Sequence, residues 1–162
     1  MSRARPLLKP IAVGIGAAFA VAAVGSTITD LGPWYRSLRQ PEWAPPDWAF
    51  PVGWTTVYVF TVAAGVTAWR AAIGDRERTR VVGLFAFNVF LNVLWSLIFF
   101  RLHRPDWAFI EVGVFWLSIM LLIIVAAERS LTAKFLLLPY LGWVSFASLL
   151  NLAVVRLNPP FA

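Results

Sequence analysis

Cysteine is absent from this chain of 162 residues, and histidine occurs once. The lack of cysteine excludes a disulfide scaffold, a cysteine nucleophile and a thiolate metal site. A single histidine excludes the usual imidazole clusters, so we expect no metal site. Charge is also scarce, because Asp, Glu, Lys and Arg make up 14% of the residues, against about 25% in a typical water-soluble domain. These absences exclude an ordinary soluble fold.

Hydrophobic residues are abundant instead, at 60% of the chain, and nine tryptophans help to bring the aromatic share to 15%. This composition predicts an integral membrane protein whose main partner is the lipid bilayer. The formal net charge of +6 could suggest nucleic acid. In so apolar a chain, it is better explained by Lys and Arg residues that flank membrane helices and set their orientation, so no nucleic-acid partner is expected.

Five stretches have the length of a transmembrane helix, and they span residues 10–29, 48–69, 81–100, 107–127 and 135–155. About 20 apolar residues are needed to cross about 30 Å of hydrocarbon as a helix, and the runs do not alternate as barrel strands do. The first run is too long for the apolar core of a signal peptide. We therefore predict an all-α bundle of five transmembrane helices, forming one domain over 1–162. Its only long connection is 30–47.

The positive charges predict the orientation of this bundle. The N-terminal segment and the connections 70–80 and 128–134 carry nine Lys and Arg residues, and the other side carries five. Because positive residues favour the cytoplasmic side, we expect the N-terminus inside and the C-terminus outside. The short N-terminus has no transit-peptide pattern, so we expect a bacterial cell (inner) membrane.

Polar and aromatic side chains recur at helical spacing inside three of the predicted helices. Residues three and four apart share a helix face, and the stripes comprise Phe50, Trp54 and Tyr58; Asn88, Asn92, Trp95 and Ser96; and Tyr140, Trp143, Ala147 and Asn151. Interfacial anchoring explains tryptophans at helix ends, but not the deep ones. The stripes favour a ligand cavity in the outer half of the membrane. The alternative is that the asparagines only join helix to helix, at about 0.6 kcal/mol each.

The few remaining ionisable groups suggest no catalytic centre. Glu111, the only charge within a predicted span, lies four residues after Trp107, close enough to the interface to snorkel. His103 lies in a short loop beside two arginines, where a solvated side chain is expected. Met120 is the only methionine within a span, so haem ligation of the cytochrome type is unsupported.

The segment 34–54 reads WYRSLRQPEWAPPDWAFPVGW and contains four prolines and four tryptophans. Proline fixes φ and biases the preceding residue towards extended conformations. We therefore predict a stiff, non-helical run that leads into the second helix and covers the mouth of the bundle as a lid.

These motifs resemble the translocator protein family, also called the tryptophan-rich sensory proteins or TspO. The resemblance covers nearly the whole chain. It rests on Trp34-Tyr35, Pro41-x-Trp43-x-Pro45-Pro46-x-Trp48-x-Phe50-Pro51, Trp54-Thr55-x-x-Tyr58, Asn92-x-Leu94-Trp95, Phe99-Phe100, Leu138-Pro139-Tyr140-Leu141-x-Trp143, Leu150-Asn151, Arg156 and Asn158.

The resemblance implies a five-helix membrane receptor, often dimeric, that needs no cofactor. Its ligands would be porphyrins or haem-related tetrapyrroles, sterols and benzodiazepine-type drugs, bound beneath the first loop. The positions that match the lining of the family pocket are Tyr35, Pro45, Trp54, Tyr58, Asn92, Trp95, Trp143 and Ala147. In the family, the tryptophans that match Trp54 and Trp143 are linked to light-dependent breakdown of bound porphyrin, so these two would be the catalytic residues of such an enzyme.

One departure from the family concerns sterols. The cholesterol motif of animal members has a tyrosine shortly before an arginine, whereas here the stretch before Arg156 is Leu152-Ala153-Val154-Val155, so sterol binding through this motif is not expected. Three functions remain open at this point: a receptor or sensor for tetrapyrroles and other lipophilic molecules, a porphyrin-degrading enzyme that uses tryptophan and light, and a transporter of such molecules.

Overall fold

The computed structural model describes residues 8–158 and residue 161. Arg3, Arg5 and the side chain of Lys9, which contribute to the predicted orientation, lie outside the described residues. Helices and short connections make up the described chain, and they are α1 (Leu8–Ile28), α2 (Pro33–Ser37), α3 (Ala49–Ala71), α4 (Gly74–Ser96), the π-helical turn η1 (Leu97–Arg101), α5 (Pro105–Ala127) and α6 (Leu131–Leu157). Five of these segments are long and apolar enough to cross a membrane, which confirms the predicted fold class.

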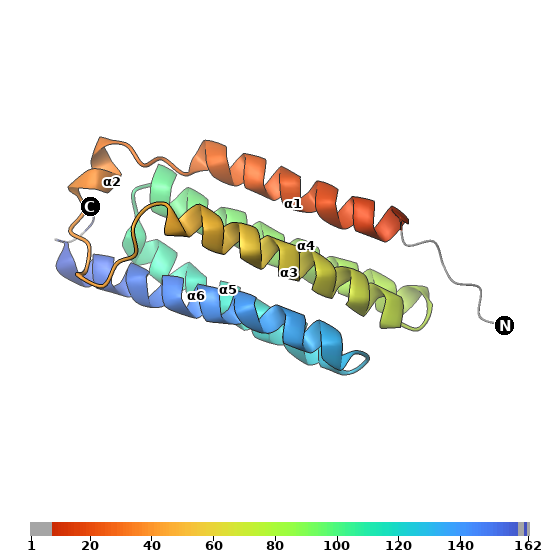
Figure 1. The fold of residues 1–162 in the computed structure, drawn as a ribbon. Helices are drawn as coiled ribbons and strands as arrows, with labels where there is room; N and C mark the ends of the chain where they lie inside the picture. Colours follow the sequence, from red (N-terminus) through yellow and green to blue (C-terminus); the bar gives the residue numbers. More distant parts are fainter. Residues whose placement is uncertain (1–7, 159–160, 162) are drawn as a thin grey trace.

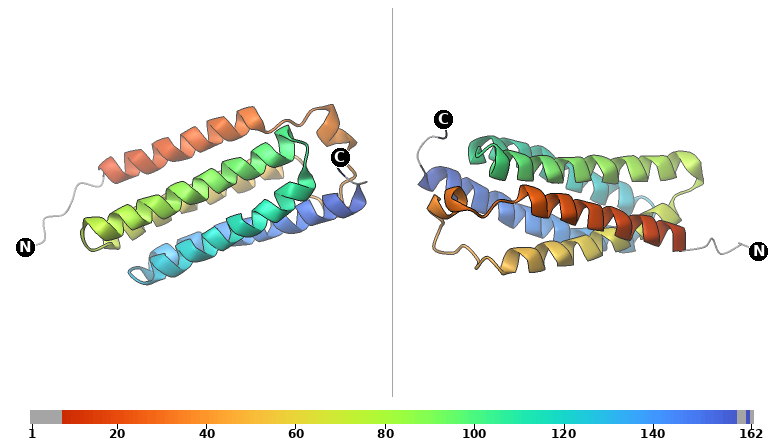
Figure 2. Two further views of the ribbon diagram at one scale, coloured as in Figure 1. Left: turned by 180° about the vertical axis from the view of Figure 1, so that it is seen from behind. Right: turned by 90° about the horizontal axis from the view of Figure 1, so that it is seen from above.

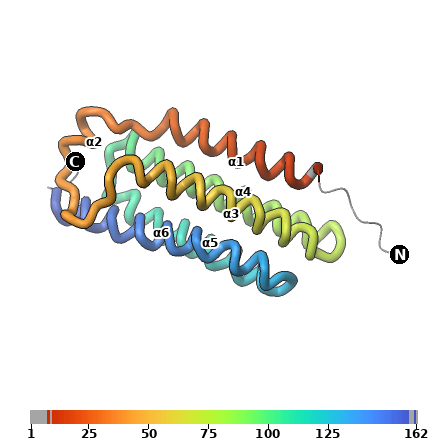
Figure 3. Tube along the Cα trace, viewed as in Figure 1, coloured from red at the N-terminus to blue at the C-terminus, as the bar shows by residue number. Residues whose placement is uncertain are grey.

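The long helices run side by side (Figure 1). Helices α3, α4, α5 and α6 form a closed four-helix arrangement in which each contacts two neighbours, and α1 packs on α3 and α4. In the view from above, α1 runs along the bundle between α3 and α4 (Figure 2, right). The trace in Figure 3 shows α2 at one end of the bundle, beside the end of α6, and the turns α3–α4 and α5–α6 at the other. We call these the lid end and the opposite end.

Large apolar side chains cover the outside of the bundle, while amides lie within it. Phe19 and Ile110 are 74% and 72% exposed, whereas Asn88 and Asn151 are each 2% exposed. A soluble protein would show the reverse distribution. In lipid the exposed apolar surface is well solvated, and the amides find partners on neighbouring helices. The exposure pattern therefore agrees with an integral membrane protein.

Several helix ends differ from the predicted ones. Helix α4 starts at Gly74 rather than 81, and α6 starts at Leu131 rather than 135, where the Ser130 hydroxyl accepts a hydrogen bond from the Ala133 amide. Both extensions carry charged residues, so these helices continue beyond the apolar segments that cross the membrane. The predicted non-helical run up to the second helix is present over 38–48, but both ends of the 34–54 segment are helical. Pro33–Ser37 forms a helical turn, and Pro51 lies in the first turn of α3, where a helix tolerates proline.

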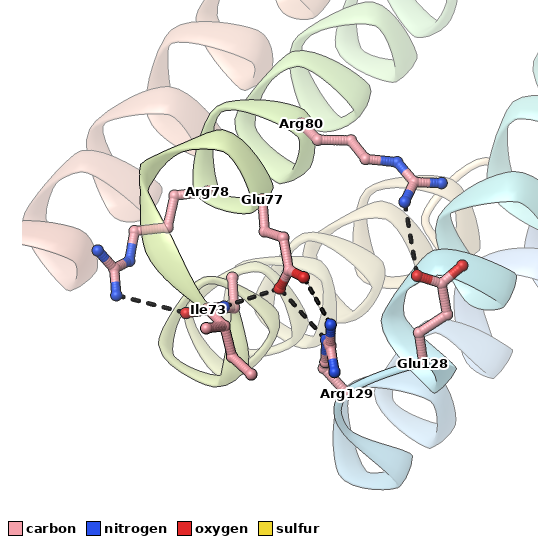
Figure 4. Close-up of polar contacts among 7 residues, drawn as sticks. Ile73, Glu77, Arg78, Arg80, Glu128 and Arg129 are labelled. Atoms are coloured by element: carbon pink, nitrogen blue, oxygen red, sulfur yellow. Dashed lines mark hydrogen bonds and ion pairs between the residues drawn. The ribbon is translucent and has the colours of Figure 1, made fainter.

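Ion pairs join the two turns at the opposite end (Figure 4). The Glu77 carboxylate accepts hydrogen bonds from the Arg129 guanidinium at 2.6 and 3.2 Å and from the Ile73 amide at 2.7 Å, and Arg80 approaches Glu128 at 3.5 Å. The hydrogen bond to Glu77 raises the pKa of Arg129. Exposed pairs of this kind contribute about 0–1 kcal/mol each. Their main effect is to fix the α3–α4 turn against the α5–α6 turn.

Glu111 does not snorkel, contrary to our expectation from the sequence. Helix α5 begins at Pro105, and both carboxyl oxygens of Glu111 are buried without a hydrogen-bond partner among the described residues. The face that carries Glu111 also carries the buried Phe115 and Ser118, and residues at this spacing share one side of a helix. The side chain therefore points into the bundle rather than along its surface.

Candidate functional site

A cavity of about 440 Å³ lies at the lid end of the bundle, within the usual size range of small-molecule sites. Residues of α1, α3, α4, η1 and α6 form its walls, the segment between α1 and α3 covers it, and α5 contributes no lining residue. Most of the lining surface is apolar. Among the described lining residues, Asp47 is the only one with a charge.

Aromatic rings dominate the walls. Nine of them line the cavity, namely Tyr35, Phe50, Trp54, Tyr58, Trp95, Phe99, Phe100, Trp143 and Phe146. The rings contact one another in pairs: Trp54 and Trp143 meet edge to face at 6.2 Å between centroids, and Trp54 and Tyr58 lie at 5.6 Å. Edge-to-face and offset pairs at such distances are favourable. The contacts form two groups of rings, one on α3 and α6 and one on α2, α4 and η1. Both groups line the same cavity.

The residues predicted as pocket lining converge on this cavity, with one exception. Tyr35, Trp54, Tyr58, Asn92, Trp95, Trp143 and Ala147 all line it. Pro45 is half-buried in the covering loop and is not one of the described lining residues. The two tryptophans linked by resemblance to porphyrin breakdown, Trp54 and Trp143, are the ones in edge-to-face contact.

The buried asparagines divide into two groups according to depth. Asn88 lies outside the lining; its amide nitrogen donates to the Ser118 hydroxyl at 2.8 Å, and its oxygen accepts from the Tyr140 hydroxyl at 2.8 Å. It joins α4 to α5 and α6, as the alternative interpretation of the stripes expected. One turn nearer the lid, Asn92 lines the cavity, where its oxygen lies 3.5 Å from the Tyr58 hydroxyl.

Trp95 is held in the wall by a second amide. Its indole N–H donates to the Asn151 side-chain oxygen at 3.2 Å, and the Asn151 amide nitrogen donates to the Pro105 carbonyl at 2.8 Å. The Trp95 ring also stacks on Phe99 at 5.2 Å. Because one asparagine bonds both the ring and the start of α5, the orientation of Trp95 depends on the packing of three segments.

The aromatic pair Phe99 and Phe100 owes its placement to the π-helical turn. The Leu102 amide donates to the Leu97 carbonyl, five residues back, at 3.0 Å, which is the π-helix pattern, often found at functional sites. The two rings lie 4.8 Å apart, and both line the cavity. Neither residue belongs to the polar and aromatic stripes, because a regular helical period would not place adjacent residues on one wall.

The cover of the cavity is anchored at several points. In α2, Trp34 stacks on His103 at 4.1 Å, and Tyr35 contacts Phe100 at 5.8 Å. Burial, and next the nearby charge of Asp47, raise the pKa of Tyr35, so its hydroxyl stays protonated and can donate a hydrogen bond. His103 is exposed, as expected for a loop histidine. Its backbone lies in the left-handed region, with φ of 54°.

Asn158 fastens the loop to the end of α6. Its side-chain oxygen accepts from the Arg39 amide at 2.9 Å, and its side-chain nitrogen donates to the Arg39 carbonyl at 3.1 Å. We call this pair of bonds the latch. It spans 119 residues of sequence and uses only the backbone of Arg39.

Comparison with known proteins identifies the chain. The model of the TspO/MBR family matches residues 12–157. The chain belongs to the TspO/MBR family. The resemblance drawn from the proline and tryptophan motifs is thereby confirmed.

Named relatives within the TspO/MBR family cover most of the chain. The "Tryptophan-rich protein TspO" of Chlorobaculum tepidum is 39% identical over 155 residues, 92% of this chain and 96% of its own length. The "Protein CrtK" of Rhodobacter capsulatus is 33% identical, covering 86% and 89%. The human "Translocator protein" is 31% identical, covering 77% and 75%. These names support a membrane sensor or receptor.

The latch of this TspO/MBR protein makes a testable prediction. Replacing Asn158 with alanine removes both of its bonds to Arg39, each worth about 0.5–1.5 kcal/mol. We expect hydrogen–deuterium exchange of the backbone over 38–47 to become about five to ten times faster. Arg39→Ala is the matched control, since it leaves the backbone groups of the latch in place. Equal exchange in both variants and the wild type would show that the latch does not hold the loop.

Proposed function

We propose that this protein is a membrane receptor that binds tetrapyrroles and other lipophilic ligands in the cavity beneath the lid. The observation that carries the proposal is the ring-rich lining of a largely apolar cavity at the lid end, where nine aromatic side chains face one space. A flat apolar macrocycle can stack on such rings and withdraw its surface from water. Asn92 and the Tyr35 hydroxyl supply a few polar groups that can orient it, as is typical of small-molecule sites.

The pocket tryptophans supply the readout of a test. Protoporphyrin, titrated in the dark into purified protein at micromolar concentration, should quench tryptophan fluorescence saturably. Trp54→Ala should weaken the affinity about tenfold, since losing one aromatic contact and its burial removes about 1.4 kcal/mol. Trp143→Ala should also reduce the quenching.

Trp107→Ala is the matched control, because Trp107 is 51% exposed and is not a lining residue. The Trp107→Ala variant should bind protoporphyrin with the same affinity as the wild type. Saturable quenching that Trp54→Ala and Trp107→Ala reduce to the same extent would place the ligand outside the cavity. No saturable quenching of the wild type would refute tetrapyrrole binding.

A second candidate function is light-dependent breakdown of bound porphyrin. The contact between Trp54 and Trp143 in the cavity wall favours it, because an indole close to a photoexcited ligand can pass an electron to it. Among the described residues, no group of three or more His, Asp or Glu side chains could hold a metal ion. Illumination of the saturated complex decides between receptor and enzyme. Product formation above that of heat-denatured protein would favour the enzyme.

The setting of the receptor follows from the charges. We infer a bacterial inner membrane, with the opposite end of the bundle facing the cytoplasm and the lid facing outward, because the Arg-rich turns lie at the opposite end. A homodimer is the proposed assembly, as the family resemblance implies. Cysteine labelling offers a test of orientation, since the chain has no cysteine of its own.

A further inference from the structure

Gly53 lies where the backbone of α3 touches the ring of Trp143. A Cβ atom on Gly53 would lie 2.5 Å from Cζ2 and from Cζ3 of that ring, and closer still to Cη2. Optimal contacts between carbon atoms are about 3.5–4.0 Å, so no side chain fits between the helix and the ring. Glycine within a helix costs about 0.5–1 kcal/mol relative to alanine. Its presence here coincides with the contact between the Trp143 ring of α6 and the backbone of α3.

Two other glycines, one on each of these helices, have room for a side chain. A Cβ on Gly65, also in α3, would lie 3.6 Å from Phe85, which is ordinary contact distance, and a Cβ on Gly142, beside Trp143, would meet no atom within 4 Å. A Cβ therefore has room at Gly65 and Gly142 but not at Gly53. Replacing either of the other two with alanine tests the general effect of a glycine-to-alanine change.

Packing alone holds the Trp143 ring. Its indole N–H is buried without a hydrogen-bond partner among the described residues. Phe50, Trp54 and Phe146 surround it at 6.3, 6.2 and 5.8 Å between ring centroids. All four rings line the cavity, so the open volume beside Trp143 is the ligand space. A ring displaced from α3 has that volume to move into.

We propose that Gly53 is a positioning residue that sets the width of the cavity and thereby its selectivity for large flat ligands. With glycine at this position, the Trp143 ring lies against the α3 backbone and leaves room for a macrocycle. With any larger residue, the ring moves into the cavity and excludes a macrocycle before it excludes a small ligand. This inference rests on the proposed function for its ligand, but not for the position of the ring.

The binding test compares Gly53→Ala with Gly65→Ala. We expect Gly53→Ala to weaken protoporphyrin binding about tenfold while changing the affinity for diazepam, a smaller ligand of the benzodiazepine type, less than twofold. Gly65→Ala should change neither. In a Trp143→Phe background, where the smaller ring leaves space for a Cβ, Gly53→Ala should change the protoporphyrin affinity less than twofold. An equal loss in both backgrounds would overturn the proposal.

A measurement without ligand separates this inference from the proposed function. Near-ultraviolet circular dichroism reports the asymmetric packing of tryptophan rings. Gly53→Ala should alter the spectrum of the wild type but leave that of Trp143→Phe unchanged. If the wild type binds no protoporphyrin and this dependence on Trp143 is still found, tetrapyrrole binding fails while the positioning role of Gly53 stands. If Gly53→Ala leaves the wild-type spectrum unchanged, the positioning role fails whatever the binding result.

Discussion

Replacement of Ala147 with tryptophan should abolish protoporphyrin binding, raising Kd by at least 100-fold. Ala147 lies on α6 one turn after Trp143 and lines the cavity, where its methyl group leaves the space open. An indole there would bring the bulk of a large aromatic side chain into a cavity of about 440 Å³. A 100-fold change corresponds to about 2.7 kcal/mol, which is reasonable for a ligand that loses its contact surface.

Two further variants make this result interpretable. Leu149→Trp introduces the same ring two residues away on a side chain that is 61% exposed, facing lipid, and it should bind like the wild type. Ala147→Leu adds a smaller side chain than Ala147→Trp, so it disturbs folding less. It should weaken protoporphyrin binding by an intermediate factor. If Ala147→Trp folds and keeps the wild-type Kd, the ligand does not occupy this cavity.

Of the substitutions considered, Asn88→Leu should cause the largest loss of stability, lowering the free energy of unfolding by about 2 kcal/mol. The substitution keeps the number of side-chain heavy atoms but removes two hydrogen bonds, one to Ser118 and one to Tyr140. Hydrogen bonds between membrane helices average about 0.6 kcal/mol, with a maximum near 1.7. Tyr140 is 3% exposed, so its hydroxyl is left buried without this acceptor, which adds to the cost. Unfolding of the purified protein by SDS in mixed micelles, followed by circular dichroism, measures the effect.

A double variant separates the lost bond from changed packing. Adding Tyr140→Phe to Asn88→Leu removes the unsatisfied hydroxyl and should recover about half of the loss, since removing both partners of a bond can be nearly neutral. Ser148→Ala is the control, because among the described residues the Ser148 hydroxyl bonds only to the Val144 carbonyl of its own helix, and the substitution should cost less than about 0.5 kcal/mol. Additive losses for Asn88→Leu and Tyr140→Phe would contradict the proposed network.

The sequence predicts those parts of the site that depend on one helix at a time. Runs of 20–22 residues with at most one charge predicted all five spans, and spacing of three and four placed Trp54 with Tyr58 and Asn92 with Trp95. Asn88 lies one turn before Asn92 on the same face of α4, but it is farther from the lid. It therefore bonds to Ser118 and Tyr140 and does not line the cavity. Which partner an amide meets depends on neighbouring helices, and periodicity within one helix does not contain that information.

Other features of the site depend on local backbone geometry and on neighbouring helices, which the sequence alone does not reveal. The π-helical turn rotates Phe99 and Phe100 onto the cavity wall, and no residue in it signals the wider turn. Gly53 also looks like any helical glycine in sequence, because its role depends on the approach of Trp143 from α6. The short distance from Trp107 along the chain predicts an interfacial position for Glu111. The face of α5 on which Glu111 lies instead points its side chain into the bundle.

The most direct test of the account is a fluorescence titration with protoporphyrin in the dark, run in the same detergent on the wild type, Ala147→Trp and Leu149→Trp. We expect saturable quenching at micromolar concentration for the wild type and Leu149→Trp, and no saturation over the same range for folded Ala147→Trp. Equal titration curves for all three proteins, or no saturation with any of them, would contradict a tetrapyrrole receptor built around this cavity.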